Sequence, residues 1–509
     1  MLLNNELLET GTPESVGISS ESIIDLIQTL QERQIECHSF QIIRRHRLIC
    51  SADYEPYRMT AQHRLFSAAK GIVALGILFL IQEGKLTEDT RIVDLLPEAA
   101  EAAAVDSNGY IQRLTLYHLL TMNSGQEEDT CMEMFLSSDW IRAFFRVPFV
   151  HFPGTWYTYN NGIPHILAAI VQRVSGQLLD EYLTPRLLDP LGIIMLCRPN
   201  AYGEYEPSNV CMSQESLTKL GLFMLDGGSW NGRQLLQPEL IRRAGSYQVP
   251  VTGVIAEGNL LASAGYGYQL WRNPFGGYRF DGGRDQHAVI IPEEEMVFSC
   301  MGNVTQQGGT LKAFWDTVFS HLYARALPEN PAAQEKLEEQ LEKLTLAPTE
   351  QLPPKKAEAA YEALAGRRYR FEDNPLHVET LRFEKEDDGY INITDQRNGT
   401  VHSMRVGTKG QWAECREYLF MDPDRTHGNF INGEDEELSY ASSAWENDHT
   451  MVIYGRGKSR MHTDRWILIF NESELTVKIY TSILLLPGFP AGDNKGEFVL
   501  RAALAGGEK

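Results

Sequence analysis

The chain has 509 residues, which is too long for one hydrophobic core, so we expect two or more domains. It is 43% hydrophobic and 22% charged, the balance of a globular protein rather than a disordered one. The 46 Lys and Arg against 68 Asp and Glu give a formal net charge of −22, which repels phosphate backbones and argues against nucleic acid as a partner.

The cysteine pattern and the amino-terminal sequence indicate in which compartment we expect the protein. The seven cysteines are scattered, odd in number and contain no C-x-x-C pair, which indicates reduced thiols rather than disulfides or a zinc site. The 13 histidines form no H-x-x-x-H or H-E-x-x-H pattern. No basic segment followed by an apolar one opens the chain, and the longest apolar run, 71–81, is shorter than the ~20 residues that span a bilayer. We therefore expect a cytoplasmic protein with no membrane span, no metal and no cofactor.

The first part of the chain, up to residue 328, mixes helical and strand patterns. The hydrophobic periodicity and the cap residues predict the following elements in chain order: a helix from Ser19, two strands with a tight connection over 38–54, a long apolar helix over 65–84, helices over 163–174 and 213–225, and strands over 265–271 and 287–300.

Composition changes after residue 328. Five prolines between 328 and 354 surround a charged stretch with leucines at helical spacing, which predicts a linker with one amphipathic helix. From residue 366 the pattern is β throughout, with alternation over 475–480 and turn signals at 397–399 and 446–448. Roughly eight short strands at this spacing indicate an antiparallel barrel or sandwich.

Ser67 and Lys70 form an S-x-x-K motif at the start of the long apolar helix. Residues three apart share a helix face, so the Lys70 amine points at the Ser67 hydroxyl. A serine hydroxyl needs such a neighbouring base to become a nucleophile, and the helix amino terminus favours developing negative charge. The motif occurs by chance about once or twice in a chain of this length, so a capping serine with a solvated lysine is the alternative.

A second polar group follows a Pro-Gly turn, in the stretch PGTWYTYNN at 153–161. Tyr159 is placed to shuttle a proton, and Asn161 to orient a substrate amide or hold the lysine. The alternative is an asparagine that caps the next helix beside a core tyrosine.

Together these motifs resemble the superfamily of serine β-lactamases, penicillin-binding proteins and esterases, nearest its class C β-lactamase-like branch. Several stretches match in order, over about residues 12–325: PESVGISSE at 13–21, the nucleophile helix at 65–98, IQRLTLYHLLTMNSG at 111–125, PGTWYTYNNG at 153–162 and the late helix and hairpin at 212–239. The resemblance implies an α/β (α+β) fold: an antiparallel sheet flanked by helices, with an all-helical subdomain.

The resemblance also implies roles for the motif residues. Ser67 is expected to be the acylated nucleophile and Lys70 its base or proton relay. Tyr159 is expected to be the second proton carrier, and Asn161 a substrate-orienting residue. How the protons divide between Lys70 and Tyr159 stays open.

The third family motif has His or Lys, a small residue and Gly on the strand beside the nucleophile. The corresponding stretch is RFDGGRDQ at 279–286, in which Gly282 fits the glycine and Phe280 stands where the cation is expected. The backbone amides of Ser67 and Gly283 are expected to form an oxyanion hole, with Gly282 and Gly283 bordering the substrate. A plain β-turn is the alternative for this stretch.

These observations predict a catalytic domain over 1–328, a Pro/Glu-rich linker over 329–365 and an all-β barrel over 366–509. LAGRRY at 364–369 resembles the entry to lipocalin-like domains that follow some β-lactamase-like hydrolases. The expected function is hydrolysis of a small ester or amide through an acyl-enzyme. A D-amino-acid peptidase or amidase and a non-catalytic binding protein on the same scaffold are the alternatives, and the sequence leaves the oligomeric state open.

Overall fold

The computed structural model of the chain describes residues 8–197, 199, 205–252, 260–304, 308–386, 389–415, 439–457, 463–481 and 497–505. It divides into two compact units. The first comprises Met1–Ala52 and Arg64–Glu342, and the second comprises Asp53–His63 and Lys343–Lys509. The chain thus enters the second unit briefly just before the nucleophile motif, which the sequence did not predict. The domain boundaries at 328 and 365 stay a prediction.

A seven-stranded sheet forms the centre of the first unit, in the order β1-β3-β2-β12-β11-β10-β9. Its neighbours are antiparallel except for the parallel pair β1–β3. The strands are β1 (Glu9–Thr10), β2 (Cys37–Arg44), β3 (Arg47–Asp53), β9 (Trp271–Arg272), β10 (Tyr278–Gly282), β11 (Gln286–Ile291) and β12 (Met296–Gly302). The predicted antiparallel sheet of a mixed helix and strand fold is confirmed.

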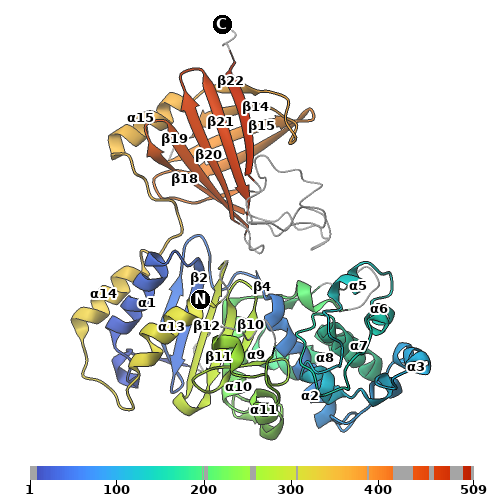
Figure 1. The fold of residues 1–509 in the computed structure, drawn as a ribbon. Helices are drawn as coiled ribbons and strands as arrows, with labels where there is room; N and C mark the ends of the chain where they lie inside the picture. The colour runs from blue at the N-terminus through green and yellow to red at the C-terminus, as the bar shows by residue number, and fades with distance from the viewer. Residues whose placement is uncertain are drawn as a thin grey trace. The chain divides into compact units, whose positions relative to one another are not determined.

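Helices cover both faces of this sheet (Figure 1). On one side lie α1 (Ser20–Glu32), α13 (Gly309–Thr317) and α14 (Pro331–Leu341). On the other, α10 (Gln214–Leu225) packs on β11 and β12, and α2 (Ala69–Gln82) packs on β10. Beyond α2 lies a helical region, which contains α3 (Pro97–Val105), α4 (Leu116–Leu120), α5 (Cys131–Phe135), α6 (Trp140–Arg146), α7 (Ile163–Ser175) and α8 (Leu179–Leu183).

Helix α2 is apolar on every side because it is enclosed on every side. Twelve consecutive residues from Ala69 to Leu80 are buried between β10, α7 and α8. Lys70 is the one charged residue in this helix. An all-apolar helix is what a position inside the core requires.

The strand predicted over 265–271 is wrong, because only Trp271–Arg272 pairs as β9. Gly265 and Gln269 adopt left-handed backbone angles, with φ of 102° and 57°. A strand requires negative φ at each residue, so these two positions interrupt it.

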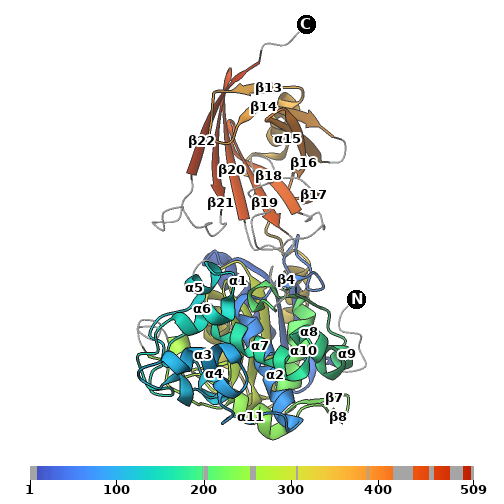
Figure 2. The ribbon, with the colours of Figure 1, turned by 90° about the vertical axis from the view of Figure 1, so that its right-hand side faces the viewer.

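The second unit contains a closed barrel of nine strands (Figure 2). They are β13 (Arg368–Phe371), β14 (Val378–Lys385), β15 (Tyr390–Arg397), β16 (Thr400–Gly407), β18 (Ser439–Asn447), β19 (Thr450–Gly457), β20 (Thr463–Asn471), β21 (Glu474–Thr481) and β22 (Glu497–Leu504). Gly407 of β16 pairs with Ser442 of β18, which closes the barrel. The interior is packed with aromatic side chains, and Trp466 is fully buried there. The predicted all-β barrel is confirmed, and its lipocalin-like character stays a prediction.

The linker holds two helices rather than the single one predicted. The first, α14, begins at Pro331 with Asn330 as its cap; the leucine spacing predicted a helix in this stretch, although α14 ends at Leu341, before Leu344. The second, α15 (Pro354–Leu364), was missed. Its Tyr361 hydroxyl lies 3.2 Å from Ser443 Oγ of the barrel. Within the described residues, no helix is long and apolar enough to cross a membrane.

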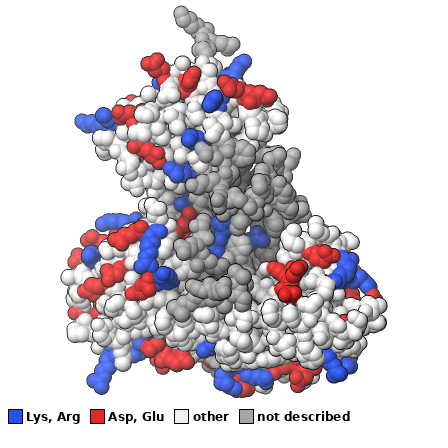
Figure 3. Space-filling model, viewed as in Figure 1, with Lys and Arg blue, Asp and Glu red and all other residues white. Residues whose placement is uncertain are grey.

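Residues Asp53–His63 join the second unit through backbone and side-chain contacts. The Glu55 amide donates to Leu344 O at 3.0 Å, and the Leu346 amide donates to Glu55 O at 2.8 Å. The Tyr57 hydroxyl donates to Gly457 O of β19 at 3.4 Å. On the face shown in Figure 3, Lys and Arg are interspersed with Asp and Glu over both units.

Candidate active site

Ser67 lies in a single 3₁₀ turn, Phe66–Ala68, directly before α2. Phe66 has a φ of 48°, a left-handed angle that is unfavourable for a bulky residue. Such a conformation costs about 1–3 kcal/mol and persists only where the surroundings impose it. The Leu65 amide donates to Val210 O at 2.9 Å and fixes the entry to this turn. The turn thereby holds the Ser67 side chain at the amino-terminal end of the buried helix.

Lys70 points at Ser67, as the three-residue spacing predicts. Its Nζ lies 2.7 Å from Ser67 Oγ and 2.8 Å from Asn161 Oδ1. The side chain is only 5% exposed, and Nζ also lies 4.9 Å from the centre of the Tyr159 ring. Burial of an amine is tolerated only with such partners, which here are two oxygens and an aromatic face. The alternative of a solvated lysine beside a capping serine does not describe this geometry.

The two adjacent asparagines make different contacts. Asn160 is fully buried, and its Oδ1 accepts from Gly162 N at 2.9 Å and from Thr130 Oγ1 at 2.8 Å. Asn160 therefore fixes the turn before α7, while the side-chain oxygen of Asn161 accepts a hydrogen bond from Lys70. The cap residue of α7 is Gly162, with no side-chain cap hydrogen bond, so the alternative of an asparagine cap does not describe this geometry.

Tyr159 lies between the lysine and an aromatic cluster. Its ring centre is 5.5 Å from that of Trp271 and 6.4 Å from that of Tyr266. The ring is partly buried, whereas Tyr266 behind it is fully buried. The cluster fixes the plane of the Tyr159 ring beneath the ammonium group of Lys70.

Gly282 brings β10 into direct contact with the nucleophile turn. A Cβ at this position would lie 2.2 Å from Leu65 O and 3.2 Å from Ala68 N, so no larger residue fits without moving the turn. At Gly283 an added Cβ would lie 3.8 Å from the Phe66 ring, which is ordinary contact. The structure therefore places both predicted glycines beside Ser67, and only Gly282 is required by space.

Phe280 packs inside the first unit, against α2. It is fully buried, and a Cβ on Gly71 of α2 would lie 2.5 Å from its ring. Phe280 and Gly282 point to the same face of β10, the one that packs on α2, because side chains alternate along a strand. Phe280 thus lies on the face of β10 that meets α2 and the Ser67 turn, and its assignment to the cation position of the third motif stays a prediction.

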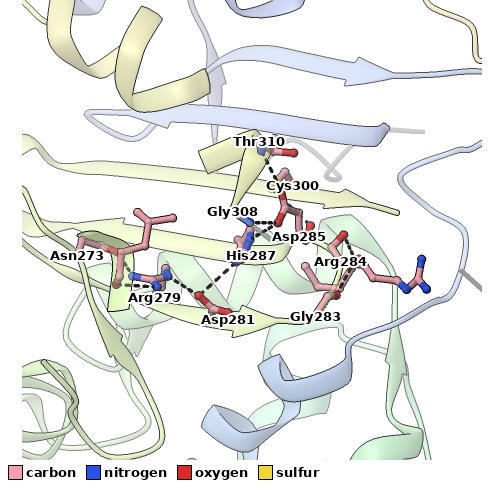
Figure 4. A network of polar contacts seen from close by, with 12 residues as sticks. Asn273, Arg279, Asp281, Gly283, Arg284, Asp285, His287, Cys300, Gly308 and Thr310 are labelled. Carbon is pink, nitrogen blue, oxygen red and sulfur yellow. Dashed lines mark hydrogen bonds and ion pairs between the residues drawn. The ribbon is translucent and has the colours of Figure 1, made fainter. Parts of the chain in front are cut away.

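Charged side chains fill the opposite face of β10 (Figure 4). Arg279 Nε donates to Asp281 Oδ2 at 2.6 Å, and both side chains are buried. His287 of β11 lies between two carboxylates, with Nδ1 3.8 Å from Asp281 Oδ2 and Nε2 3.3 Å from Asp285 Oδ1. This network lies directly behind the turn that carries Gly283.

Asp285 anchors that turn to α13. Its carboxylate accepts from the Gly308 amide at 2.5 Å and from the Thr310 amide at 2.7 Å. Burial alone would raise the pKa of Asp285, but His287 and the two amides outweigh it and hold the pKa of that carboxyl below its usual range. Arg284 and Asp285 both have left-handed φ, of 62° and 67°. Because these angles are unfavourable for residues other than glycine, the turn needs the hydrogen bonds of Asp285 to keep this conformation.

The sequence analysis missed Asp129, Asp285 and His287 as parts of this neighbourhood. Asp129 contacts Asn161, and the other two support the Gly283 turn. No spacing signal connects Asp129 to the motifs, because 32 residues separate it from Asn161. In the described part of the chain, no group of three or more His, Cys, Asp and Glu is placed to hold a metal ion.

Comparison with known proteins identifies relatives of the first unit. Residues 23–194, which include the S-x-x-K and Y-x-N motifs, match the family model named Beta-lactamase. Esterase EstB of Burkholderia gladioli is 28% identical over 205 residues, which cover 35% of this chain and 50% of EstB. Protein flp of Staphylococcus aureus (strain COL) is 29% identical over 138 residues, 26% of this chain and 27% of flp. The matches thus span half or less of these relatives.

Among solved structures, an octameric penicillin-binding protein homologue from Pyrococcus abyssi is similar with a TM-score of 0.45 and 16% identity, covering 90% of this chain and 99% of that one.

The close approach at Gly282 predicts a difference between neighbouring glycine substitutions. Gly282→Ala should lower the free energy of unfolding by about 1–3 kcal/mol, because the new methyl group must displace the turn at Leu65. Gly283→Ala adds the same group where there is room and should change it by about 0.5 kcal/mol or less. Urea unfolding of the two variants measures the difference, and equal effects would contradict the proposed constraint.

The anchor at Asp285 predicts a pH-dependent stability. Asp285→Asn should destabilise the protein by about 2–4 kcal/mol at pH 7, because a buried hydrogen-bonded carboxylate is lost. A lowered folded pKa gives stability that is present above the unfolded value near 4 and is lost as the pH falls below it. The gap between wild type and variant should therefore narrow as the pH falls below about 4. A gap independent of pH, measured by thermal unfolding, would contradict this assignment.

Proposed function

Because residues 23–194 are a domain of the β-lactamase family, we propose that this protein is a serine hydrolase. It forms a covalent acyl-enzyme on Ser67 with a small ester or amide. The observation that carries the proposal is the 2.7 Å contact between Lys70 Nζ and Ser67 Oγ in a nearly closed environment. The similarity to EstB, which is named as an esterase, favours an ester over an amide as the first substrate to test.

In the proposed reaction, Ser67 Oγ attacks the carbonyl carbon while its proton passes to the amine of Lys70, or through that amine to Tyr159. The carbonyl π electrons move to oxygen, and the backbone amides of Ser67 and Gly283 bind the resulting oxyanion. Collapse of this intermediate expels the alcohol or amine, which takes up the proton that Ser67 released. Water then attacks the acyl-enzyme by the same steps and frees the acid and Ser67.

Two other functions remain as candidates on the same scaffold. A D-amino-acid peptidase or amidase would use the same residues, and hydrolysis of D-alanine amides without ester hydrolysis would select it. A non-catalytic binding protein would need no serine in contact with a buried amine. The hydrogen bond between Ser67 and Lys70 therefore favours an enzyme.

Removing the nucleophile tests the proposal directly. We expect the wild-type protein to hydrolyse p-nitrophenyl esters and to be labelled by a fluorophosphonate probe at Ser67. Ser67→Ala should lose the label and reduce kcat by ~10³-fold or more. Ser320→Ala, at an exposed serine outside the site, is the matched control and should behave as wild type. Equal labelling and turnover in wild type and Ser67→Ala would refute the proposal.

The role of Lys70 can be separated from its charge. Arginine keeps a positive charge and hydrogen-bond donors but does not release a proton at neutral pH. If Lys70 accepts the serine proton, Lys70→Arg should lose about 100-fold or more in kcat/KM, as much as Lys70→Ala. Activity of Lys70→Arg close to wild type in the p-nitrophenyl ester assay would show that only the charge matters.

A further inference from the structure

The carboxylate of Asp129 accepts hydrogen bonds from both the backbone amide and the side-chain NH₂ group of Asn161. Asp129 Oδ1 accepts from the Asn161 backbone amide at 2.8 Å, and Asp129 Oδ2 accepts from Asn161 Nδ2 at 2.6 Å. Asp129 lies in the loop before α5, and Oδ1 also accepts from the Cys131 amide at 3.1 Å. Both oxygens are therefore used, and both bind groups that only donate.

This contact decides which end of the Asn161 side chain faces Lys70. The oxygen and NH₂ ends of an amide have nearly the same shape, so packing alone does not select between them. A carboxylate only accepts hydrogen bonds, so Asp129 selects the NH₂ end. The Asn161 oxygen is then turned to Lys70 Nζ, at 2.8 Å. In the flipped orientation, two donors would face each other at the lysine.

The loop that carries Asp129 is itself fixed by the neighbouring residues. Thr130 Oγ1 donates to Asn160 Oδ1 at 2.8 Å, and the Thr130 amide donates to the same oxygen at 3.3 Å. Hydrogen bonds thus join Thr130 to Asn160 and Asp129 to Asn161. The result is a continuous series of hydrogen bonds from Asp129 through Asn161 and Lys70 to Ser67.

We propose that Asp129 is a positioning residue for the reaction: it sets the orientation of Asn161, which in turn holds the Lys70 amine on Ser67. The inference rests on the proposed function, since it assigns a role within that reaction. Hydrogen bonds connect Asp129 to Lys70 by way of Asn161, so its effect passes through Asn161. A misplaced catalytic group lowers the rate of the chemical step rather than ground-state binding.

Two substitutions at Asp129 test this role in the full-length protein. Asp129→Asn keeps the shape but replaces one acceptor by a donor, and Asp129→Ala removes both acceptors. We expect kcat for p-nitrophenyl butyrate to fall about tenfold and about 100-fold respectively, with KM changed less than about twofold. The rate constant of fluorophosphonate labelling should fall in parallel. Asp139→Asn, at the exposed cap of α6, is the matched control and should behave as wild type.

Exchanging the two side chains provides a rescue. In the double variant D129N/N161D, the amide oxygen at position 129 can accept from the backbone amide at 161, and its NH₂ can donate to the new carboxylate. The other oxygen of that carboxylate then faces Lys70. We therefore expect the double variant to exceed both single variants, Asp129→Asn and Asn161→Asp, in kcat by about threefold or more.

The outcomes separate this inference from the proposed function. Unchanged kcat in Asp129→Ala, or a loss confined to KM, would overturn it, and the latter would instead assign Asp129 to substrate binding. A double variant no better than the single ones would also overturn it. A wild-type protein that is neither labelled nor active would refute the proposed function itself, whatever the variants show.

Discussion

The burial of one lysine amine inside an apolar helix is the constraint on which the site depends. Lys70 lies in α2 between β10, α7 and α8, where it is only 5% exposed. An uncompensated charge or amine there would cost several kcal/mol. Its compensation comes from Ser67, Asn161 and the face of Tyr159, which belong to two distant parts of the chain. The groups that make the lysine tolerable are thus the same groups that would use it in catalysis.

The sheet sets the distance between Ser67 and the predicted oxyanion donors through two close approaches. Gly71 of α2 leaves space for the Phe280 ring, and Gly282 of β10 leaves space for the carbonyl of Leu65. Both are contacts that a single methyl group would prevent. Asp285 then holds the turn after β10 to α13 by hydrogen bonds. Strand β10 is thus held by apolar packing on the face toward α2 and by hydrogen bonds and ion pairs on the opposite face.

The sequence predicted those parts of the site that depend on local geometry. The Ser67–Lys70 contact follows from helical spacing, and Asn161 from a motif that immediately precedes α7. Long-range partners were not predictable, because Asp129 and Asp285 carry no periodic signal and their roles appear only when loops meet. The failed strand over 265–271 has a similar cause, since its apolar pattern is real but Gly265 and Gln269 take left-handed angles. The burial of Phe280 against Gly71 was likewise not predictable, because it depends on how β10 packs on α2 rather than on motif order.

Chain connectivity places a short segment of the second unit directly before the turn that carries Ser67, which the sequence did not suggest. Residues Asp53–His63 belong to that unit, and Ser67 follows only four positions after His63. The segment is held there by Glu55 pairing with the strand-like stretch at Leu344–Leu346 and by Tyr57 on β19. Phe66 takes its strained angle within this short connection. The Leu65 amide, bonded to Val210 O, and the close approach of Gly282 leave this turn little freedom to relax, which is how an unfavourable φ beside Ser67 is maintained.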